Sequence, residues 1–174
     1  MCRPNSEPPH EPNLRDVHRA AVHEASHALL ASKYSDWVCF WILPPGGVEI
    51  PEGGETLGRV GGCCKFAEFQ DERGKAALAW AGFIGERMTD DQEIALPLLI
   101  IEATKILKLL APLDWEALLA VPEDVRSDGA KLAYGLLKAE WGLVLSEAHL
   151  LEEAFRPPNY RVREFDRERG WHWH

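Results

Sequence analysis

Residues 20–31 read Ala-Ala-Val-His-Glu-Ala-Ser-His-Ala-Leu-Leu-Ala, and this stretch contains the most informative motif of the chain. The stretch contains no proline or glycine and is rich in helix formers and core residues, so it predicts a helix. His23 and His27 are four residues apart, which places both imidazoles on one helix face, about 40° apart. Glu24 lies about 100° from His23 and would be close to anything that the two histidines bind.

A helix with the pattern His-Glu-x-x-His is typical of zinc hydrolases. Zn²⁺ lowers the pKa of a bound water toward about 7, and a carboxylate then takes the proton as the hydroxide attacks a carbonyl group. The alternative is a helix that carries these polar residues on a solvent-exposed face without a metal. The apolar flanks indicate a half-buried helix instead, in which two histidines and a glutamate without partners would be unfavourable. We therefore predict a zinc site with His23 and His27 as ligands and Glu24 as the catalytic base.

The composition predicts a globular protein. The 174 residues suit one domain with its own core, and 46% of them are hydrophobic. The net charge of −9 argues against a nucleic-acid partner. No apolar run is long enough to cross a bilayer, and the N-terminus has no apolar signal segment, so we expect a cytoplasmic protein without a membrane partner. The four cysteines show no metal-binding spacing and are expected to be buried free thiols.

The order of the predicted elements indicates an α+β domain that is mostly helical. A flexible tail is expected over residues 1–13, one domain over 14–156 and a charged C-terminal tail over 157–174, in which His172 and His174 would be mobile. Helices are predicted over 14–32, 71–88, 97–110, 114–119, 127–141 and 146–155. Strands are predicted over 37–43 and, weakened by glycines, over 57–64. If the strand over 37–43 borders the active-site cleft, it could hold an extended peptide.

Two stretches carry a resemblance to a known family. The run Val22-His-Glu-Ala-Ser-His-Ala-Leu29 resembles the His-Glu-Ala-Gly-His-Ala signature of the FtsH-type zinc peptidases, the proteolytic domains of membrane-bound AAA+ proteases. Farther on, Trp80-Ala-Gly-Phe-Ile-Gly-Glu86 is similar to the Leu-Ala-Gly-x-x-Ala-Glu helix of that family. The resemblance covers roughly residues 16–92. It implies a zincin-like helix beside a small sheet, a helical C-terminal half and assembly into a homo-oligomer.

The resemblance also implies a third zinc ligand, an aspartate at the start of a helix. Thr89-Asp-Asp-Gln-Glu-Ile-Ala95 is the nearest match, which favours Asp91. Asp114 and Asp128 are alternatives, since each lies at a predicted helix start, where an aspartate also serves as an N-cap. Glu86 is a further alternative, although its place in the Ala-Gly helix suggests packing or support of a ligand.

The sequence thus predicts a zinc metalloendopeptidase that hydrolyses peptides or unfolded proteins. We expect it to work without ATP, because Gly74-Lys75 is followed by Ala76 and not by the serine or threonine of a phosphate-binding loop. Two alternatives remain open. One is a degenerate, peptidase-like module that binds proteins, and the other is a zinc amidase that acts on small molecules.

Overall fold

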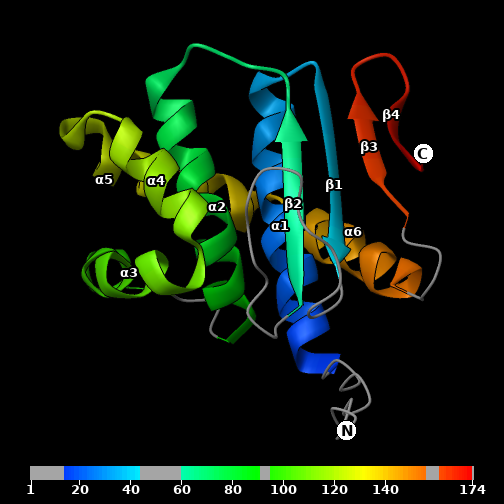
Figure 1. Ribbon diagram of the computed structural model, residues 1–174. Helices are drawn as coiled ribbons and strands as arrows, with labels where there is room; N and C mark the ends of the chain where they lie inside the picture. The colour runs from blue at the N-terminus through cyan, green and yellow to red at the C-terminus, as the bar shows by residue number, and fades with distance from the viewer. Residues whose placement is uncertain (1–13, 44–59, 91–94, 156–160, 174) are drawn as a thin grey trace, which may run out of the picture.

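The computed structural model describes residues 14–43, 60–90, 95–155 and 161–173. Within them it has a predominantly helical α+β fold with one small sheet, which confirms the predicted fold class (Figure 1). The helices are α1 (Leu14–Tyr34), α2 (Glu72–Asp90), α3 (Leu96–Leu110), α4 (Pro112–Ala120), α5 (Glu123–Ala139) and α6 (Trp141–Ala154). The strands are β1 (Trp37–Leu43), β2 (Gly61–Phe66), β3 (Arg163–Asp166) and β4 (Gly170–Trp173).

The sheet is antiparallel and has the strand order β2-β1-β3-β4. Successive side chains of a strand point to opposite faces, and in β1 the residues Val38, Phe40 and Ile42 lie on one face and are all buried. Helix α1 packs against β1 and β2, and Figure 1 shows it running behind these two strands. The core therefore lies between this face of the sheet and α1.

Helix α1 is the centre of the helical layer as well. It packs against α2 and α6, and α2 packs in turn against α5 (Figure 1). The α2–α5 contact is close because of Gly129, where an added Cβ would lie 2.8 Å from the backbone carbonyl carbon of Ala76. Since α1 is enclosed on several sides, most of its residues are buried, including the polar Glu24, Ser26 and His27. Burial of this kind places the polar motif inside the protein, where its groups need partners.

The prediction of a C-terminal tail over residues 157–174 is wrong for most of that segment. Strand β3 pairs with β1, so that Arg163 lies opposite Phe40, and β4 completes a hairpin with β3. A buried ion pair fixes the segment further, with Arg163 Nε 2.7 Å from an oxygen of Glu147 on α6. His172 is therefore part of a strand, whereas His174 lies outside the described residues.

The helix and strand predictions are confirmed for α1, β1, α2, α3 and α4, within about two residues at each end. Two helix starts are wrong. Helix α5 begins at Glu123, after Pro122, because the proline has a fixed φ and two acidic residues follow it in the first turn. Helix α6 begins at Trp141, where buried Val144 packs into the core. The second strand is displaced to Gly61–Phe66, and residues 1–13 and 44–59 lie outside the described part.

Three cysteines fall within the described residues and all three are free thiols, of which Cys39 is buried and Cys63 and Cys64 are half-buried. None of the helices in the described ranges is both long and apolar enough to cross a membrane.

Candidate metal centre

Helix α1 presents both motif histidines to one point. The Nε2 atoms of His23 and His27 are 3.1 Å apart, and the two rings meet edge to face. Both side chains are largely buried, with 16% of His23 and 8% of His27 exposed. Because the residues are one helical turn apart, the helix itself sets this spacing.

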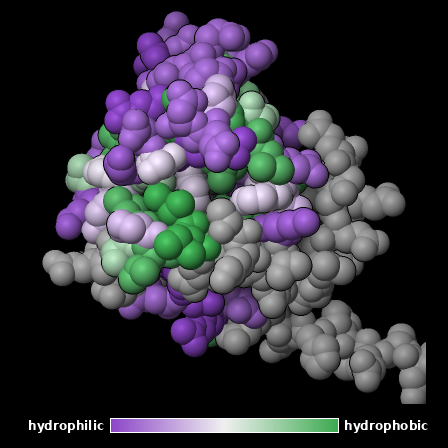
Figure 2. Space-filling view, turned by 90° about the vertical axis from the view of Figure 1, so that its left-hand side faces the viewer, coloured by the Kyte–Doolittle hydropathy of each residue, from purple (hydrophilic) through white to green (hydrophobic). Residues whose placement is uncertain are grey.

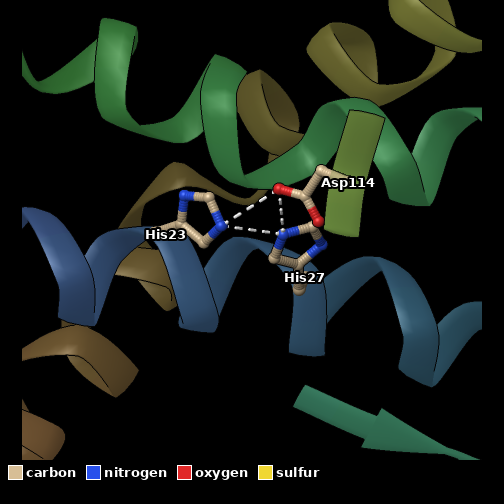
Figure 3. A group of neighbouring side chains, drawn as sticks. All are labelled: His23, His27 and Asp114. Carbon is tan, nitrogen blue, oxygen red and sulfur yellow. Dashed lines mark hydrogen bonds and ion pairs between the residues drawn. The ribbon is translucent and has the colours of Figure 1, made fainter. Parts of the chain in front are cut away.

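A carboxylate from another element completes the group. Asp114 Oδ2 lies 3.2 Å from Nε2 of His23 and 3.3 Å from Nε2 of His27. Figure 3 shows the three side chains pointing toward one another, two from α1 and one from α4. Asp114 is the third residue of α4, where the free backbone N–H groups of a helix start favour a negative charge. These three donor atoms form one of the groups that could hold a metal ion.

The separations fit a small tetrahedral ion. Nitrogen and oxygen ligands bind zinc at about 2.0–2.2 Å, so two ligands at a tetrahedral angle lie about 3.3–3.6 Å apart. The three measured separations are 3.1, 3.2 and 3.3 Å. No side chain would need to move by more than a few tenths of an ångström to meet a common ion.

The other residues predicted as the third ligand do not take the place of Asp114 beside the two histidines. Asp128 is exposed on α5 and pairs with Lys131, so it is not part of this group. Glu86 bonds to the other ring nitrogen, with its Oε1 2.7 Å from Nδ1 of His23. Asp91, which the sequence favours, lies outside the described residues. Of the alternatives within the described ranges, Asp114 is the one whose oxygen meets both Nε2 atoms.

Glu86 gives His23 a defined orientation. The Glu86 carboxylate accepts an N–H from Nδ1, and this contact turns Nε2 toward His27 and Asp114, where it would bind a metal after losing its own proton. Histidine ligands of metals commonly have such a partner on the second nitrogen. The prediction that Glu86 supports a ligand is therefore consistent with its position.

Glycines bring the neighbouring elements close to the motif. On α2, a Cβ added at Gly82 would lie 2.6 Å from Cδ2 of His23 and closer still to Cε1 and Nε2, and one at Gly85 would lie 2.9 Å from Cβ of Ser26. Real Cβ atoms essentially never approach other atoms so closely. The sequence pattern Ala-Gly-x-x-Gly-Glu over residues 81–86 thus places two glycines and Glu86 along the face of α2 that contacts α1.

Glu24 lies beside the donor group without belonging to it. It is 6% exposed and packs under β2, where a Cβ added at Gly62 would lie 2.5 Å from its Oε1. Burial raises the pKa of Glu24, although the charges of His23 and His27 act in the opposite direction. A carboxylate with a raised pKa is a better proton acceptor near neutral pH.

The ionisation of the donors reflects their mutual contacts. Burial would lower the pKa of His23, but its hydrogen bonds to Asp114 and Glu86 outweigh this and raise the pKa well above its usual value. The effect on Asp114 is opposite, because the charge of His27 and hydrogen bonds to both histidines outweigh burial and lower its pKa far below its usual range. Without a metal, the site is thus a hydrogen-bonded histidine–carboxylate cluster.

A second group of possible ligands lies in the C-terminal hairpin and consists of Glu164, Asp166 and His172. Its carboxylates already have a cation, since Arg169 Nε is 2.5 Å from Asp166 Oδ2 and its Nη2 is 3.9 Å from Glu164 Oε1. The other oxygen of Asp166 accepts backbone N–H groups of Glu168 and Arg169, which closes the turn. These contacts account for the two carboxylates as part of a stabilised hairpin, whereas Nε2 of His172 is buried and has no hydrogen-bond partner among the described residues.

Comparison with known proteins adds no relative. No protein-family model matches the chain, and no curated protein matches it. The resemblance to FtsH-type peptidases therefore depends on residues 22–29 and 80–86 of this sequence.

Proposed function

We propose that the protein is a zinc metallopeptidase whose ligands are His23, His27 and Asp114. The observation that carries the proposal is the triangle of donor atoms with sides of 3.1, 3.2 and 3.3 Å, which is within a few tenths of an ångström of the size that a tetrahedral zinc site requires. Three protein ligands leave one position for water or substrate, as in catalytic zinc sites. The buried Glu24 on the same helix supports a hydrolytic role over a purely structural one.

Each side chain has a defined task in this mechanism. A zinc ion bound by the three donors would lower the pKa of a bound water to about 7 and polarise a substrate carbonyl. Glu24 accepts the proton of the attacking water and then donates it to the nitrogen of the leaving amine, so its carboxylate is regenerated. Glu86 accepts the N–H of His23 Nδ1, which holds the ring with Nε2 toward the other two donors and makes Nε2 a more basic ligand.

The position of β2 supports a peptide substrate. The prediction that strand 37–43 could border the cleft is wrong for the described sheet, because β1 is internal and pairs with both β2 and β3. The outermost strand beside α1 is β2, whose Gly62 contacts Glu24. An extended peptide that pairs with an outer strand aligns through its backbone, largely independently of sequence. Pairing with β2 would bring a peptide bond close to Glu24.

The test combines zinc content with proteolysis of the zinc-loaded protein. Glu24→Gln should retain zinc and hydrolyse an unfolded protein about 10²–10⁴-fold more slowly, because it removes the base and not a ligand. Asp128→Asn, an exposed acidic residue on another helix, is the matched control and should leave both unchanged. Full activity of Glu24→Gln would contradict the mechanism. Zinc binding without cleavage of any polypeptide would instead support a protein-binding module or a small-molecule amidase.

A further inference from the structure

The C-terminal hairpin holds a group of side chains that the proposed peptidase mechanism does not use. Glu164, Asp166 and His172 each offer one ligand atom, and these three atoms lie within 4.8 Å of one another. The hairpin lies at the far right of Figure 1, whereas Figure 2 shows the opposite side of the molecule, where α3, α4 and α5 lie. In the sheet, β1 separates the hairpin from β2, the strand that contacts Glu24. The group is therefore separate from the candidate metal centre.

The strand register brings the three side chains to one face of the sheet. Glu164 lies opposite His172 on β4 and opposite Cys39 on β1, so these side chains share a face. Asp166 is two residues from Glu164 and shares it as well. Phe40, the neighbour of Cys39, points to the other face, so the group lies on the side of the sheet that is turned away from α1. The side chains of Glu164, Asp166 and His172 are nevertheless only 13%, 19% and 23% exposed.

One ring nitrogen of His172 lacks a hydrogen-bond partner. Nδ1 lies 3.0 Å from the carbonyl oxygen of Gly170, and because a carbonyl only accepts hydrogen bonds, Nδ1 carries a proton. In a neutral imidazole, Nε2 then has the lone pair. That atom is buried and has no hydrogen-bond partner among the described residues. A ring that donates from one nitrogen to a backbone carbonyl and keeps a lone pair on the other has the form of a metal-binding histidine.

The two carboxylates are held in place by hydrogen bonds of their own. The indole Nε1 of Trp37 donates to Glu164 Oε1 over 2.7 Å, and two backbone N–H groups of the turn donate to Asp166 Oδ1. Asp166 Oδ2 lies 3.9 Å from Nε2 of His172. Since two ligands of a tetrahedral zinc ion lie about 3.3–3.6 Å apart, a shift of a few tenths of an ångström would bring these two atoms to a common ion.

The cation that faces the carboxylates can be displaced. Arg169 Nε lies 2.5 Å from Asp166 Oδ2 and its Nη2 lies 3.9 Å from Glu164 Oε1, yet the side chain of Arg169 is 65% exposed. Ion pairs of exposed side chains are weak, because water and salt screen them. A divalent ion gains both carboxylates and, in addition, the imidazole nitrogen, which the guanidinium cannot use because it only donates hydrogen bonds from its N–H groups to acceptors other than a metal ligand set.

We propose that Glu164, Asp166 and His172 form a second metal site, which binds a divalent transition-metal ion such as zinc and fastens the C-terminal hairpin. Zinc accepts imidazole and carboxylate ligands, whereas calcium and magnesium prefer sites made of oxygen alone. The ion has to displace a guanidinium and draw together ligand atoms that are up to 4.8 Å apart. Its affinity is therefore lower than that of the centre on α1, so it is released during purification and returns when zinc is added in excess.

The test follows the imidazole signals of His172 by NMR while zinc is added to the full-length protein beyond the first equivalent. Zinc at Nε2 should shift these signals, whereas those of His149, which is exposed on α6, should change far less. Calorimetry then measures the affinity of this second binding step in variants. His172→Phe and Asp166→Asn should each weaken it at least tenfold, since loss of a ligand costs at least as much as loss of a ligand's supporting partner, about 10–100-fold.

A further variant removes no ligand and therefore tests the site even if the ligand variants fail to fold. Arg169→Gln deletes the competing cation but keeps the backbone N–H that Asp166 binds, so it should bind zinc about two- to fivefold more tightly. Arg167→Gln is the matched control. This neighbouring arginine is also exposed and pairs with Asp36, so its loss should leave the affinity unchanged.

The readouts belong to the hairpin and do not depend on whether the centre on α1 binds zinc or cleaves peptides. An excess of zinc that leaves the signals of His172 unchanged, or that shifts those of His149 equally, would overturn the assignment. The assignment is also wrong if Asp166→Asn keeps the wild-type affinity, or if Arg169→Gln binds zinc more weakly than Arg167→Gln.

Discussion

Replacement of Gly82 by alanine tests whether α2 sets the position of the first histidine. The added Cβ would lie 2.6 Å from Cδ2 of His23 and closer still to Nε2, the atom that faces the other two donors. Ordinary contacts of this kind are 3.4–4 Å, so either the ring or the helix must shift by roughly 1 Å. Ligand distances in a metal site tolerate only about 0.2 Å.

The Gly82→Ala substitution should have two effects, a lower free energy of unfolding and a weaker affinity for zinc, and the size of each can be estimated. Overpacking of a well-packed contact costs about 1–3 kcal/mol of stability. Displacement of a ligand should weaken zinc binding at least as much as loss of its supporting partner, which is typically about 10–100-fold. We therefore expect Gly82→Ala to bind zinc about 100-fold more weakly and to unfold at lower denaturant concentration than the wild type.

The assay is competition for zinc with a chromophoric chelator, combined with urea unfolding of the metal-free protein. Gly135→Ala is the matched control, because a Cβ at this glycine of α5 meets nothing within 4 Å. Alanine is a better helix former than glycine, so this control should be stabilised by about 0.5–1 kcal/mol and should bind zinc normally. Wild-type zinc affinity in Gly82→Ala would refute the role assigned to this contact.

Three further predictions concern the same cluster and the C-terminal hairpin. Glu86→Gln should weaken zinc binding about 10–100-fold, measured by the same competition, since a neutral amide holds Nδ1 of His23 less well. An unchanged affinity would show that Glu86 does not support the ligand His23. Because the pKa of His23 is raised in the metal-free protein, its stabilising contribution is complete below about pH 6.5 and is lost as the pH rises through the raised pKa. Urea unfolding of the metal-free protein should thus show a lower stability at pH 9 than at pH 6.5. The zinc-loaded protein should be more stable at pH 9, because zinc binds the unprotonated imidazole. The same pH trend in both forms would contradict the role given to His23. Arg163→Met leaves the buried carboxylate of Glu147 without its partner and should cost about 3–5 kcal/mol in urea unfolding, with exposed Arg167→Met near neutral as the control.

The first half of the fold can be predicted because its signals are local. The spacing of apolar residues in α1 and the run of aromatic and branched residues in β1 each specify one kind of element. The His-Glu-x-x-His motif fixes its own geometry, because one helical turn separates the two histidines. These parts need no information from elsewhere in the chain.

The C-terminal hairpin could not be predicted, because its stability comes from distant residues. Three of the four residues of β3 are charged, so β3 carries no alternating apolar pattern. In β4, Trp171 and Trp173 do alternate with Gly170 and His172, but four residues are too few for the pattern to specify a strand. Their order depends on pairing with β1 and on the contact between Arg163 and Glu147. Such long-range pairing is not encoded in any short window.

The third donor illustrates the same limit. Several aspartates lie at or near helix starts, and a local pattern does not distinguish an N-cap from a ligand. Asp114 reaches the histidines because α4 packs against α2, which in turn packs against α1. A sequence signal does exist in Pro112, which marks the first turn of α4 and places Asp114 at its third residue.

The central claim is that His23, His27 and Asp114 bind one zinc ion. Its most direct test is the zinc content of the purified, untagged protein, measured for the wild type beside Asp114→Ala, Asp128→Ala and Asp91→Ala. The account predicts about one zinc ion per chain in the wild type and in the Asp128 and Asp91 variants, and loss of zinc in Asp114→Ala. A wild type that takes up no zinc after reconstitution, or an Asp114→Ala variant that keeps its zinc, would contradict it.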